Sequence, residues 1–227
     1  AAYDRHGEMV ALESVETPVI HGADGDDFPV LDVLAAAQHT IAALGAGPIA
    51  ALGMTSMGEV GTVITDAGLA DVAFPAWYDD RGAEVIEALE ERWGATHLRD
   101  VTGRHCRTTS TVAKLAHAHA SAGAVPAGEF VGLCGALAYQ LTGHAWQEAG
   151  LATTSGVYDL LHRTYLTELW EAAGLGHVRL APVRAPGHSA PATGPLALAL
   201  GLVEGAAVVI AGHDHPVASV GAGVRSG

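Results

Sequence analysis

The stretch from Ala206 to Gly223 constrains the fold of this 227-residue chain more than any other part of it. It opens with a short apolar run, residues 206–211, whose β-branched side chains predict a buried strand. Helical sequence follows at once. Asp214 is a residue type that caps helices, and Pro216 suits a first helical turn, where a missing N–H costs no hydrogen bond. An acidic side chain is therefore expected where a strand ends and a helix begins.

Two interpretations of Asp214 follow from this position. The side chain either caps the helix and serves only the fold, or it acts as a catalytic carboxylate. In open α/β sheets, ligands bind outside the carboxyl ends of the strands, which is where Asp214 is expected to lie. The stretch by itself leaves both interpretations open, and the rest of the chain has to decide between them.

The composition is that of a globular α/β chain. Hydrophobic residues make up 49% and aromatic residues 5% of the sequence, and 29 glycines with many alanines favour helices packed closely on a sheet. A formal charge of −14 with only 11 Lys and Arg argues against a nucleic-acid partner. No apolar run is long enough to span a membrane, residues 1–20 lack a signal-peptide pattern, and two cysteines fit a reducing compartment. We therefore expect a cytoplasmic protein with no membrane partner.

Hydrophobic periodicity predicts the order of the elements. Strands are expected at 1–3, 8–15, 48–54 and 62–65, and helices at 30–44 and 82–93. From about 96 to 176 the expected elements are helices, around 110–120, 129–141 and 158–173, which we interpret as a helical insertion in an α/β domain. A proline-rich stretch at 181–195 predicts an extended connection, and a short helix is expected at 196–202.

Thirteen histidines raise the question of a metal site. His117 and His119 are two residues apart, and on a helix such residues do not share a face. His213 and His215 could point the same way on an extended segment, but the sequence shows no third ligand cluster near them. We therefore predict no metal site. The phosphate-binding Gly-Lys-Ser/Thr loop, the dinucleotide Gly-x-Gly-x-x-Gly motif and the Gly-x-Ser-x-Gly nucleophile elbow do not occur in the sequence.

Short segments in order along nearly the whole chain carry a family resemblance. They are residues 1–7, 51–59, 77–81 (which fits Trp-x-Asp-x-Arg), 141–143 (Leu-Thr-Gly), 152–159, and 212–214 followed by 218–223. In this order and spacing they resemble the N-terminal domain of the FGGY-type carbohydrate kinases, the group that includes glycerol kinase and xylulokinase. Gly58 and Thr109 depart from the pattern, because glycerol kinase has an Arg and a Tyr at about these positions.

The resemblance implies the fold and the activity. The implied fold is an α/β domain of the actin-like ATPase (ribonuclease H-like) type over residues 1–227, with a mixed sheet flanked by helices and a helical insertion at about 96–176. The implied activity is ATP-dependent phosphorylation of a sugar or polyol hydroxyl, with ATP and Mg²⁺ as cofactors, and a homodimer is left open. The first strand with the phosphate loop, and the C-terminal domain with most of the ATP site, would lie outside these residues. The chain alone is therefore expected to be an incomplete catalytic unit.

The resemblance also assigns site residues. Asp214 falls where the family places the general base that accepts the proton of the attacking hydroxyl. Glu59 falls where a side chain contacts substrate hydroxyls, and Trp77 where an indole packs on the carbon face of the polyol. Asp79 and His215 are expected to bind substrate as well. A polyol offers hydroxyls on one side and C–H groups on another, so a carboxylate together with an aromatic plane suits both.

Two alternatives come from other functional classes. One is a sugar-binding or regulatory protein that keeps this fold without transferring phosphate, although pure binding needs no carboxylate at position 214. The other is a metal-dependent hydrolase built on the histidines, which metal analysis of the purified protein would reveal.

Overall fold

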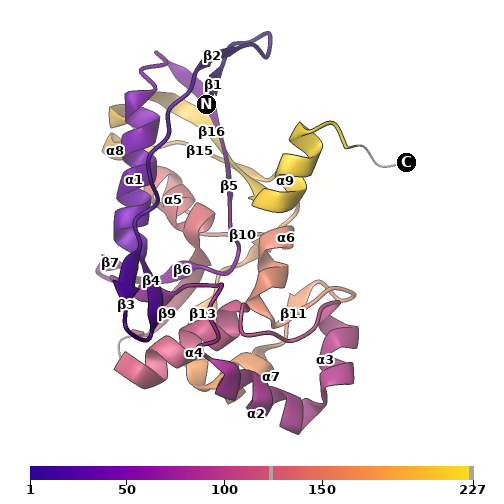
Figure 1. The fold of residues 1–227 in the computed structure, drawn as a ribbon. Helices are drawn as coiled ribbons and strands as arrows, with labels where there is room; N and C mark the ends of the chain where they lie inside the picture. The colour runs from indigo at the N-terminus through magenta and orange to yellow at the C-terminus, as the bar shows by residue number, and fades with distance from the viewer. Residues whose placement is uncertain (123–124, 225–227) are drawn as a thin grey trace.

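A computed structural model describes residues 1–122 and 125–224 of the chain. These residues form a mixed α/β fold in which helices pack on both parallel and antiparallel strands (Figure 1). The last residues of the expected domain, 225–227, lie outside the described part. Within that part, no helix is long and apolar enough to cross a membrane.

The strand β16 (Leu202–His213) is the centre of the sheet that positions the site. It lies between β5 (Ile49–Ser56), to which it runs parallel, and β15 (Ser189–Pro191), to which it runs antiparallel. Every second side chain from Ala206 to Ile210 is buried, as expected for a strand with one face in the core. The predicted strand at 206–211 is therefore confirmed, although it starts earlier than expected.

The C-terminal ends of β16 and β5 lie side by side. Gly212 pairs with Thr55 and His213 with Ser56 in the parallel register. The Thr55 hydroxyl donates a hydrogen bond of 2.8 Å to the carbonyl oxygen of Gly212, which holds the two strand ends together. Helix α9 (Asp214–Gly221) then begins directly after β16, so the predicted change from strand to helix at this point is also confirmed.

Two further sheets and several short elements complete the fold. One sheet has the order β13 (Val178–Leu180), β9 (Gly128–Gly132), β6 (Gly61–Thr65), β7 (Gly68–Leu69), and another contains β3 (Ile20–Gly22), β4 (Gly25–Pro29) and β8 (Ala73–Pro75). Short pairs are β1 (Ala2–Tyr3) with β2 (Met9–Ala11), β10 (Gln147–Glu148) with β14 (Val183–Arg184), and β11 (Tyr158–Asp159) with β12 (Thr164–Tyr165).

Helices cover these sheets. They are α1 (Val30–Ala43), α2 (Ala83–Trp93), α3 (Ala95–Thr102), α4 (Thr111–Ala122), α5 (Leu133–Thr142), α6 (Ala149–Ala152), α7 (Thr167–Trp170) and α8 (Gly194–Ala199), with a 3₁₀ turn η1 (Thr153–Ser155) and a π turn η2 (Glu171–Leu175). Helix α5 is buried along most of its length and packs against β5, β6 and β16. It therefore joins two of the sheets into one core.

Two of the predicted helices are wrong in part. The helix predicted over 129–141 begins only at Leu133, because residues 129–132 belong to β9, which is paired with β6 on one side and β13 on the other. Pairing on both edges overrides the local helical pattern. The segment 96–176 accordingly carries α4 and α5 where helices were predicted. It also carries α3, which was not predicted, and β9, a central strand of a sheet.

The helix predicted over 158–173 is replaced in its first half by the hairpin of β11 and β12. The Asp159 carboxylate accepts backbone hydrogen bonds of 2.8 Å from both Leu161 and His162, which stabilises a turn in place of a helix. Arg163 adopts a positive φ of 56° within this turn. Helix α7 therefore begins only at Thr167.

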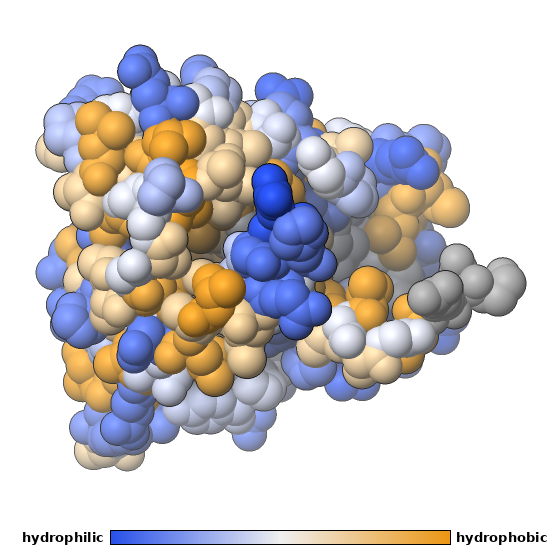
Figure 2. All heavy atoms as spheres, turned by 90° about the horizontal axis from the view of Figure 1, so that it is seen from above, coloured by the Kyte–Doolittle hydropathy of each residue, from blue (hydrophilic) through white to orange (hydrophobic). Residues whose placement is uncertain are grey.

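The N-terminal strands leave apolar side chains in contact with solvent. Strands β1 and β2 pair only with each other among the described residues. Tyr3, Val10 and Leu12 are 64%, 61% and 66% exposed. Figure 2 views the molecule from above and shows apolar surface on this face beside a strongly polar ridge.

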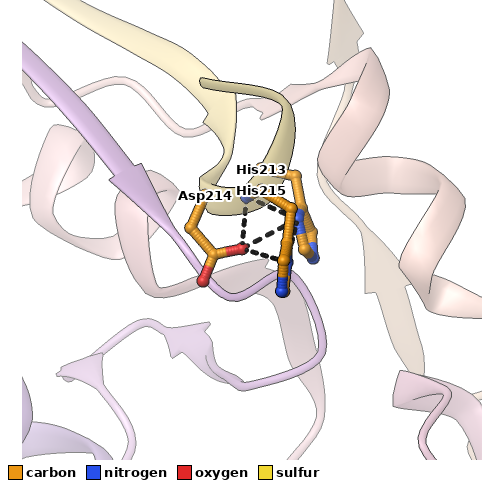
Figure 3. A group of neighbouring side chains, drawn as sticks. All are labelled: His213, Asp214 and His215. Carbon is orange, nitrogen blue, oxygen red and sulfur yellow. Dashed lines mark hydrogen bonds and ion pairs between the residues drawn. The ribbon is translucent and has the colours of Figure 1, made fainter. Parts of the chain in front are cut away.

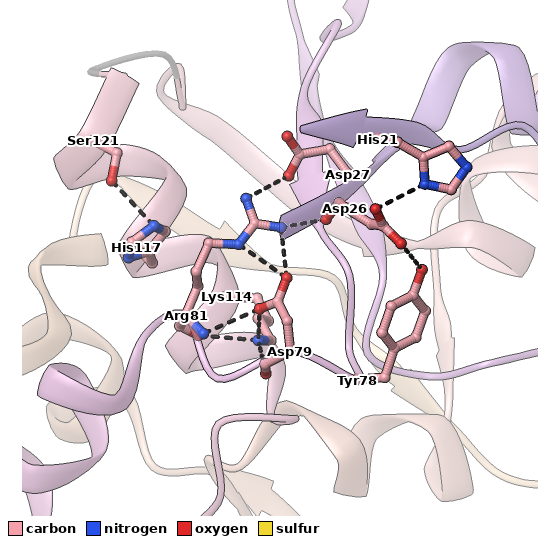
Figure 4. A network of polar contacts seen from close by, with 9 residues as sticks. All are labelled: His21, Asp26, Asp27, Tyr78, Asp79, Arg81, Lys114, His117 and Ser121. Atoms are coloured by element: carbon pink, nitrogen blue, oxygen red, sulfur yellow. Dashed lines mark hydrogen bonds and ion pairs between the residues drawn. The ribbon is translucent and has the colours of Figure 1, made fainter. Parts of the chain in front are cut away.

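A buried ion-pair network links β4, the turn after β8 and helix α4 (Figure 4). The ammonium of Lys114 is fully buried and donates hydrogen bonds to Asp79 Oδ1 (2.8 Å), to the Asp79 carbonyl (2.6 Å) and to the Arg81 carbonyl (3.0 Å). The Arg81 guanidinium pairs with Asp79 Oδ2 (2.6 Å) and Asp27 Oδ1 (2.9 Å). Burial acts to raise the pKa of Asp79, but the hydrogen bonds from Arg81 and Lys114 outweigh it and hold that pKa below its usual range.

We expect replacement of Lys114 by Met to destabilise the protein by about 3–5 kcal/mol at neutral pH, because it leaves the Asp79 carboxylate partly buried without its lysine partner. Urea unfolding followed by circular dichroism measures this change. Since the pKa of Asp79 is lowered in the folded state, the difference should be present at neutral pH and shrink as the pH falls through that lowered pKa.

The exposed pair of Arg99 and Asp100 offers a matched control, because Arg99→Ala removes an ion pair of similar length that is open to water. Its unfolding midpoint should stay close to that of the unmodified protein. A Lys114→Met midpoint equally close to it would show that the network does not stabilise the fold.

Candidate functional site

A cavity of about 610 Å³ lies at the carboxyl end of β16 and beside the loop that follows β5. Glu59, Trp77 and His215 line it, so the fold brings together three of the five side chains that the sequence analysis assigned to the site. Asp214 adjoins this cavity through its contacts with His213 and His215, which both line it. Asp79 is not among the lining residues.

Glu59 is buried between β5 and β6 with its carboxylate facing His213. Its Oε2 lies 4.0 Å from His213 Nε2 and accepts a hydrogen bond of 3.1 Å from the Gly58 amide. The Glu59 carbonyl oxygen accepts from the Thr111 hydroxyl at 2.9 Å, which fixes the backbone against the start of α4. The Gly58 amide thus holds the Glu59 carboxylate, and the Thr111 hydroxyl holds the Glu59 backbone, at the wall of the cavity.

Gly58 has a steric reason to be glycine. A Cβ atom at this position would lie 2.4 Å from Thr154 Oγ1, so any side chain would collide with η1. The packing of the loop against Thr154 therefore requires glycine at this position, where glycerol kinase has an arginine. No arginine side chain can contact a substrate from position 58 in this chain.

The junction of β16 and α9 presents three polar side chains in succession, His213, Asp214 and His215 (Figure 3). The residue in the N-cap position is His213, whose Nδ1 accepts a hydrogen bond from the His215 amide at 3.4 Å. Asp214 is the first residue of the helix, so the interpretation of Asp214 as the helix cap is wrong. A carboxylate in the first turn is nevertheless stabilised by the positive end of the helix dipole.

The Asp214 carboxylate is oriented through one of its two oxygens. Its Oδ1 accepts a hydrogen bond of 2.7 Å from the His215 amide and lies 2.9 Å from His213 Nδ1 and 2.8 Å from His215 Nδ1. In Figure 3 the second oxygen points away from both histidines. Among the described residues, no hydrogen-bond partner is found for Oδ2, so it is available to a ligand.

Asp79 has a different environment from the other predicted site residues. Both of its carboxylate oxygens are engaged, Oδ1 by Lys114 and Oδ2 by Arg81. These contacts fix the turn that presents Trp77, whose ring lies edge-on to Tyr78 with centroids 5.5 Å apart. Direct contact between Asp79 and substrate stays a prediction. The geometry favours an indirect role, in which Asp79 positions the turn.

Two charged residues of the cavity were not found by the sequence analysis. Glu148 is buried and accepts hydrogen bonds from the amides of Gly150 (2.7 Å) and Leu151 (3.2 Å) at the start of α6. Arg104 lines the cavity and donates to the Thr153 carbonyl at 3.2 Å. Neither residue carries a sequence signal, because Glu is not a common helix-capping residue and Arg104 lies in a loop with no motif.

The cavity can therefore recognise a molecule with hydroxyl groups. The carboxylates of Glu59 and Asp214 accept hydrogen bonds, and Arg104 donates them. The half-exposed indole of Trp77 offers an apolar plane on which C–H groups can pack. This combination of acceptors, a donor and an aromatic face is what a sugar or polyol requires.

Comparisons with known proteins agree with this chemistry. The family described as "FGGY family of carbohydrate kinases, N-terminal domain" matches residues 2–221. A search of curated proteins finds no match. Among solved structures, the gluconate kinase from Lactobacillus acidophilus is similar with a TM-score of 0.84 and 20% identity, over 97% of this chain and 46% of that one.

Two other solved kinases are similar in the same way. The xylulose kinase from Rhodospirillum rubrum has a TM-score of 0.81 and 18% identity, over 92% of this chain and 45% of that one. The Plasmodium falciparum glycerol kinase with ADP has a TM-score of 0.81 and 11% identity, over 96% of this chain and 46% of that one.

The chain thus spans a little less than half the length of these kinases. The similarity confirms the predicted fold class, a mixed α/β domain of the actin-like ATPase type. Since the family match runs over nearly the whole sequence, the chain belongs to the FGGY family of carbohydrate kinases and corresponds to their N-terminal domain.

Proposed function

We propose that this chain forms the sugar-binding part of an ATP-dependent kinase that phosphorylates a hydroxyl of a sugar or polyol, with Asp214 as the general base. The observation that supports this most is the position of the Asp214 carboxylate, at the start of α9 beside a cavity lined by Glu59 and Trp77. Membership of a carbohydrate-kinase family supplies the reaction class.

The proposed reaction uses the two oxygens of Asp214 differently. Oδ1 is held by the His215 amide and flanked by the two imidazoles, so the carboxylate has one orientation. Oδ2 accepts the proton of the substrate hydroxyl while the hydroxyl oxygen attacks the γ-phosphorus of ATP, and ADP leaves with the former bridging oxygen. In phosphoryl transfer the protein mainly positions the reactants and neutralises charge, so an oriented carboxylate is the part expected from this side of the site.

The other residues of the cavity bind the sugar in this proposal. Glu59 accepts a hydrogen bond from one hydroxyl, His215 contacts another, and Trp77 packs on the carbon face. Arg104 is the one cation among the lining residues that the structure describes. It would donate hydrogen bonds to a hydroxyl or carboxylate oxygen of the substrate.

The lining of this cavity does not fit Mg²⁺ or the triphosphate of ATP. Mg²⁺ requires several oxygen ligands, but the Glu148 carboxylate is committed to capping α6. A cavity lined by Glu59 and Glu148 with one arginine repels a triphosphate. We therefore assign no nucleotide or magnesium contact to the residues that line this cavity, and Asp214 acts on the substrate hydroxyl alone.

The activity itself is tested by ADP release from the full-length gene product across a panel of polyols, ketoses, aldoses and aldonates. We expect one of these substrate classes to support turnover well above the background of ATP hydrolysis. Uniform background rates over the whole panel would argue for a binding protein that keeps the fold without phosphotransfer.

Asp214→Asn is expected to lower kcat by about 10²–10⁴-fold with little change in sugar affinity, because the amide keeps the shape of the side chain but cannot take the proton. Steady-state ADP release gives kcat, and calorimetric titration gives sugar affinity. Asp66→Asn, in the exposed turn between β6 and β7, is the matched control and should leave both unchanged. A kcat of Asp214→Asn near that of the unmodified enzyme would leave Asp214 with a role in the fold alone.

Glu59→Ala is expected to weaken sugar binding by about 1.5–3 kcal/mol, the contribution of a hydrogen bond to a charged group. Trp77→Ala should weaken binding as well, through lost apolar contact, while Trp77→Phe should retain part of it. Calorimetric titration with the best substrate of the panel measures both effects. Unchanged affinity in both alanine variants would place the sugar site elsewhere in the protein.

A further inference from the structure

We propose that His213, Asp214 and His215 form a three-donor binding site for a first-row transition-metal ion such as Zn²⁺ or Co²⁺, at the edge of the sugar cavity. The donor atoms are His213 Nδ1, Asp214 Oδ1 and His215 Nδ1, and all lie within 4.8 Å of one another (Figure 3). Imidazole nitrogen and carboxylate oxygen form the donor set that suits these ions.

The spacing of the donors matches that of ligands around one ion. The carboxylate oxygen lies 2.9 Å from one imidazole nitrogen and 2.8 Å from the other, and the two nitrogens are 3.4 Å apart. With metal–ligand bonds of about 2.1 Å, neighbouring ligands are about 3.0 Å apart in an octahedral site and about 3.4 Å apart in a tetrahedral one. The three donors therefore already have ligand spacing before any ion binds.

The change from strand to helix creates this arrangement. His213 is the last residue of β16, and His215 is the second residue of α9. At this bend the side chains two residues apart turn to the same side, and the imidazole rings stack with centroids 5.1 Å apart and planes at 20°. On a continuous helix they would not share a face. The third donor, missing from the sequence analysis, is the residue between them.

Electrostatics favour a cation among the three donors. The His215 amide donates its shorter hydrogen bond, of 2.7 Å, to Asp214 Oδ1 and lies 3.4 Å from His213 Nδ1. Asp214 Oδ1, a lone-pair acceptor, lies 2.9 Å from His213 Nδ1 and 2.8 Å from His215 Nδ1. Two acceptors this close repel each other unless a proton or a metal ion lies between them.

The Glu59 carboxylate lies behind His213, close enough to act on the ring through its charge but beyond hydrogen-bond distance. Its Oε2 lies 4.0 Å from His213 Nε2, the ring nitrogen that faces away from the donors. A carboxylate at this nitrogen favours the tautomer with the proton on Nε2, which leaves Nδ1 free to bind metal. The side chains of His213, Asp214 and His215 are 18%, 46% and 83% exposed, so the remaining coordination positions are open to water or a ligand.

If Asp214 is the general base, as proposed above, a metal ion bound to it would interfere with catalysis. An ion bound to Asp214 Oδ1 withdraws charge from the carboxylate and occupies the edge of the sugar cavity. It therefore competes with the role of Asp214 as base. Mg²⁺ has little tendency to enter, because it prefers oxygen ligands and keeps most of its waters.

The test is a titration of the purified, chelator-treated protein with Co²⁺, followed by visible absorbance, and with Zn²⁺, followed by calorimetry. We expect one ion per chain and a loss of affinity of at least about 10-fold in both His215→Ala and Asp214→Asn. The exposed His39→Ala on α1 is the matched control and should bind like the unmodified protein. Because His215 is mostly exposed, its variant should fold, which circular dichroism verifies.

Absence of one-to-one binding by the unmodified protein, or equal affinity in the His215→Ala variant, would overturn the proposal. The role of Asp214 is tested separately by assaying the full-length enzyme at a Co²⁺ concentration that saturates the site. Loss of turnover supports both the metal site and the base. Site-specific binding with unchanged turnover would keep the metal site and contradict the assignment of Asp214 as base.

Discussion

The parallel pairing of β16 with β5 is the contact on which the site depends. It is fixed at its carboxyl end by the register of Gly212 with Thr55 and by the hydrogen bond between the Thr55 hydroxyl and the Gly212 carbonyl. Because both strands end there, the loop carrying Glu59 and the helix that begins at Asp214 start from neighbouring points. The side chains that we assign to sugar binding and catalysis thus come from segments more than a hundred residues apart.

The ion-pair network behind the cavity contributes in a different way. Lys114, on α4, is fully buried and bonded to the turn that contains Asp79 and presents Trp77. Arg81 extends the same network to Asp27 on β4. A buried lysine is costly unless its charge is paired and its protons are bonded, and here both conditions are met. The network thereby holds the turn that presents Trp77 to the cavity.

The strand of 206–211 and the helix that follows it could be predicted from the local pattern, because they meet at a sharp boundary. The resemblance to the kinase family predicted the fold class and pointed to Glu59, Trp77 and His215, which the structure brings to one cavity. The local pattern failed where pairing with distant strands overrides it, as in β9. It could not find Arg104, since a loop residue with no motif is placed only by the three-dimensional packing. The Asp79 side chain was judged by its motif alone, and its ion pairs with Arg81 and Lys114 are visible only in the structure.

We propose that the cavity at the carboxyl end of β16 is where this member of the kinase family binds its sugar. A crystal structure of the protein with the sugar or polyol that gives the fastest ADP release tests this most directly. We expect the ligand between the Trp77 indole and the Glu59 carboxylate, with one hydroxyl within hydrogen-bond distance of Asp214 Oδ2. A ligand bound at another surface, with this cavity filled only by water, would show that the sugar site lies elsewhere in the protein.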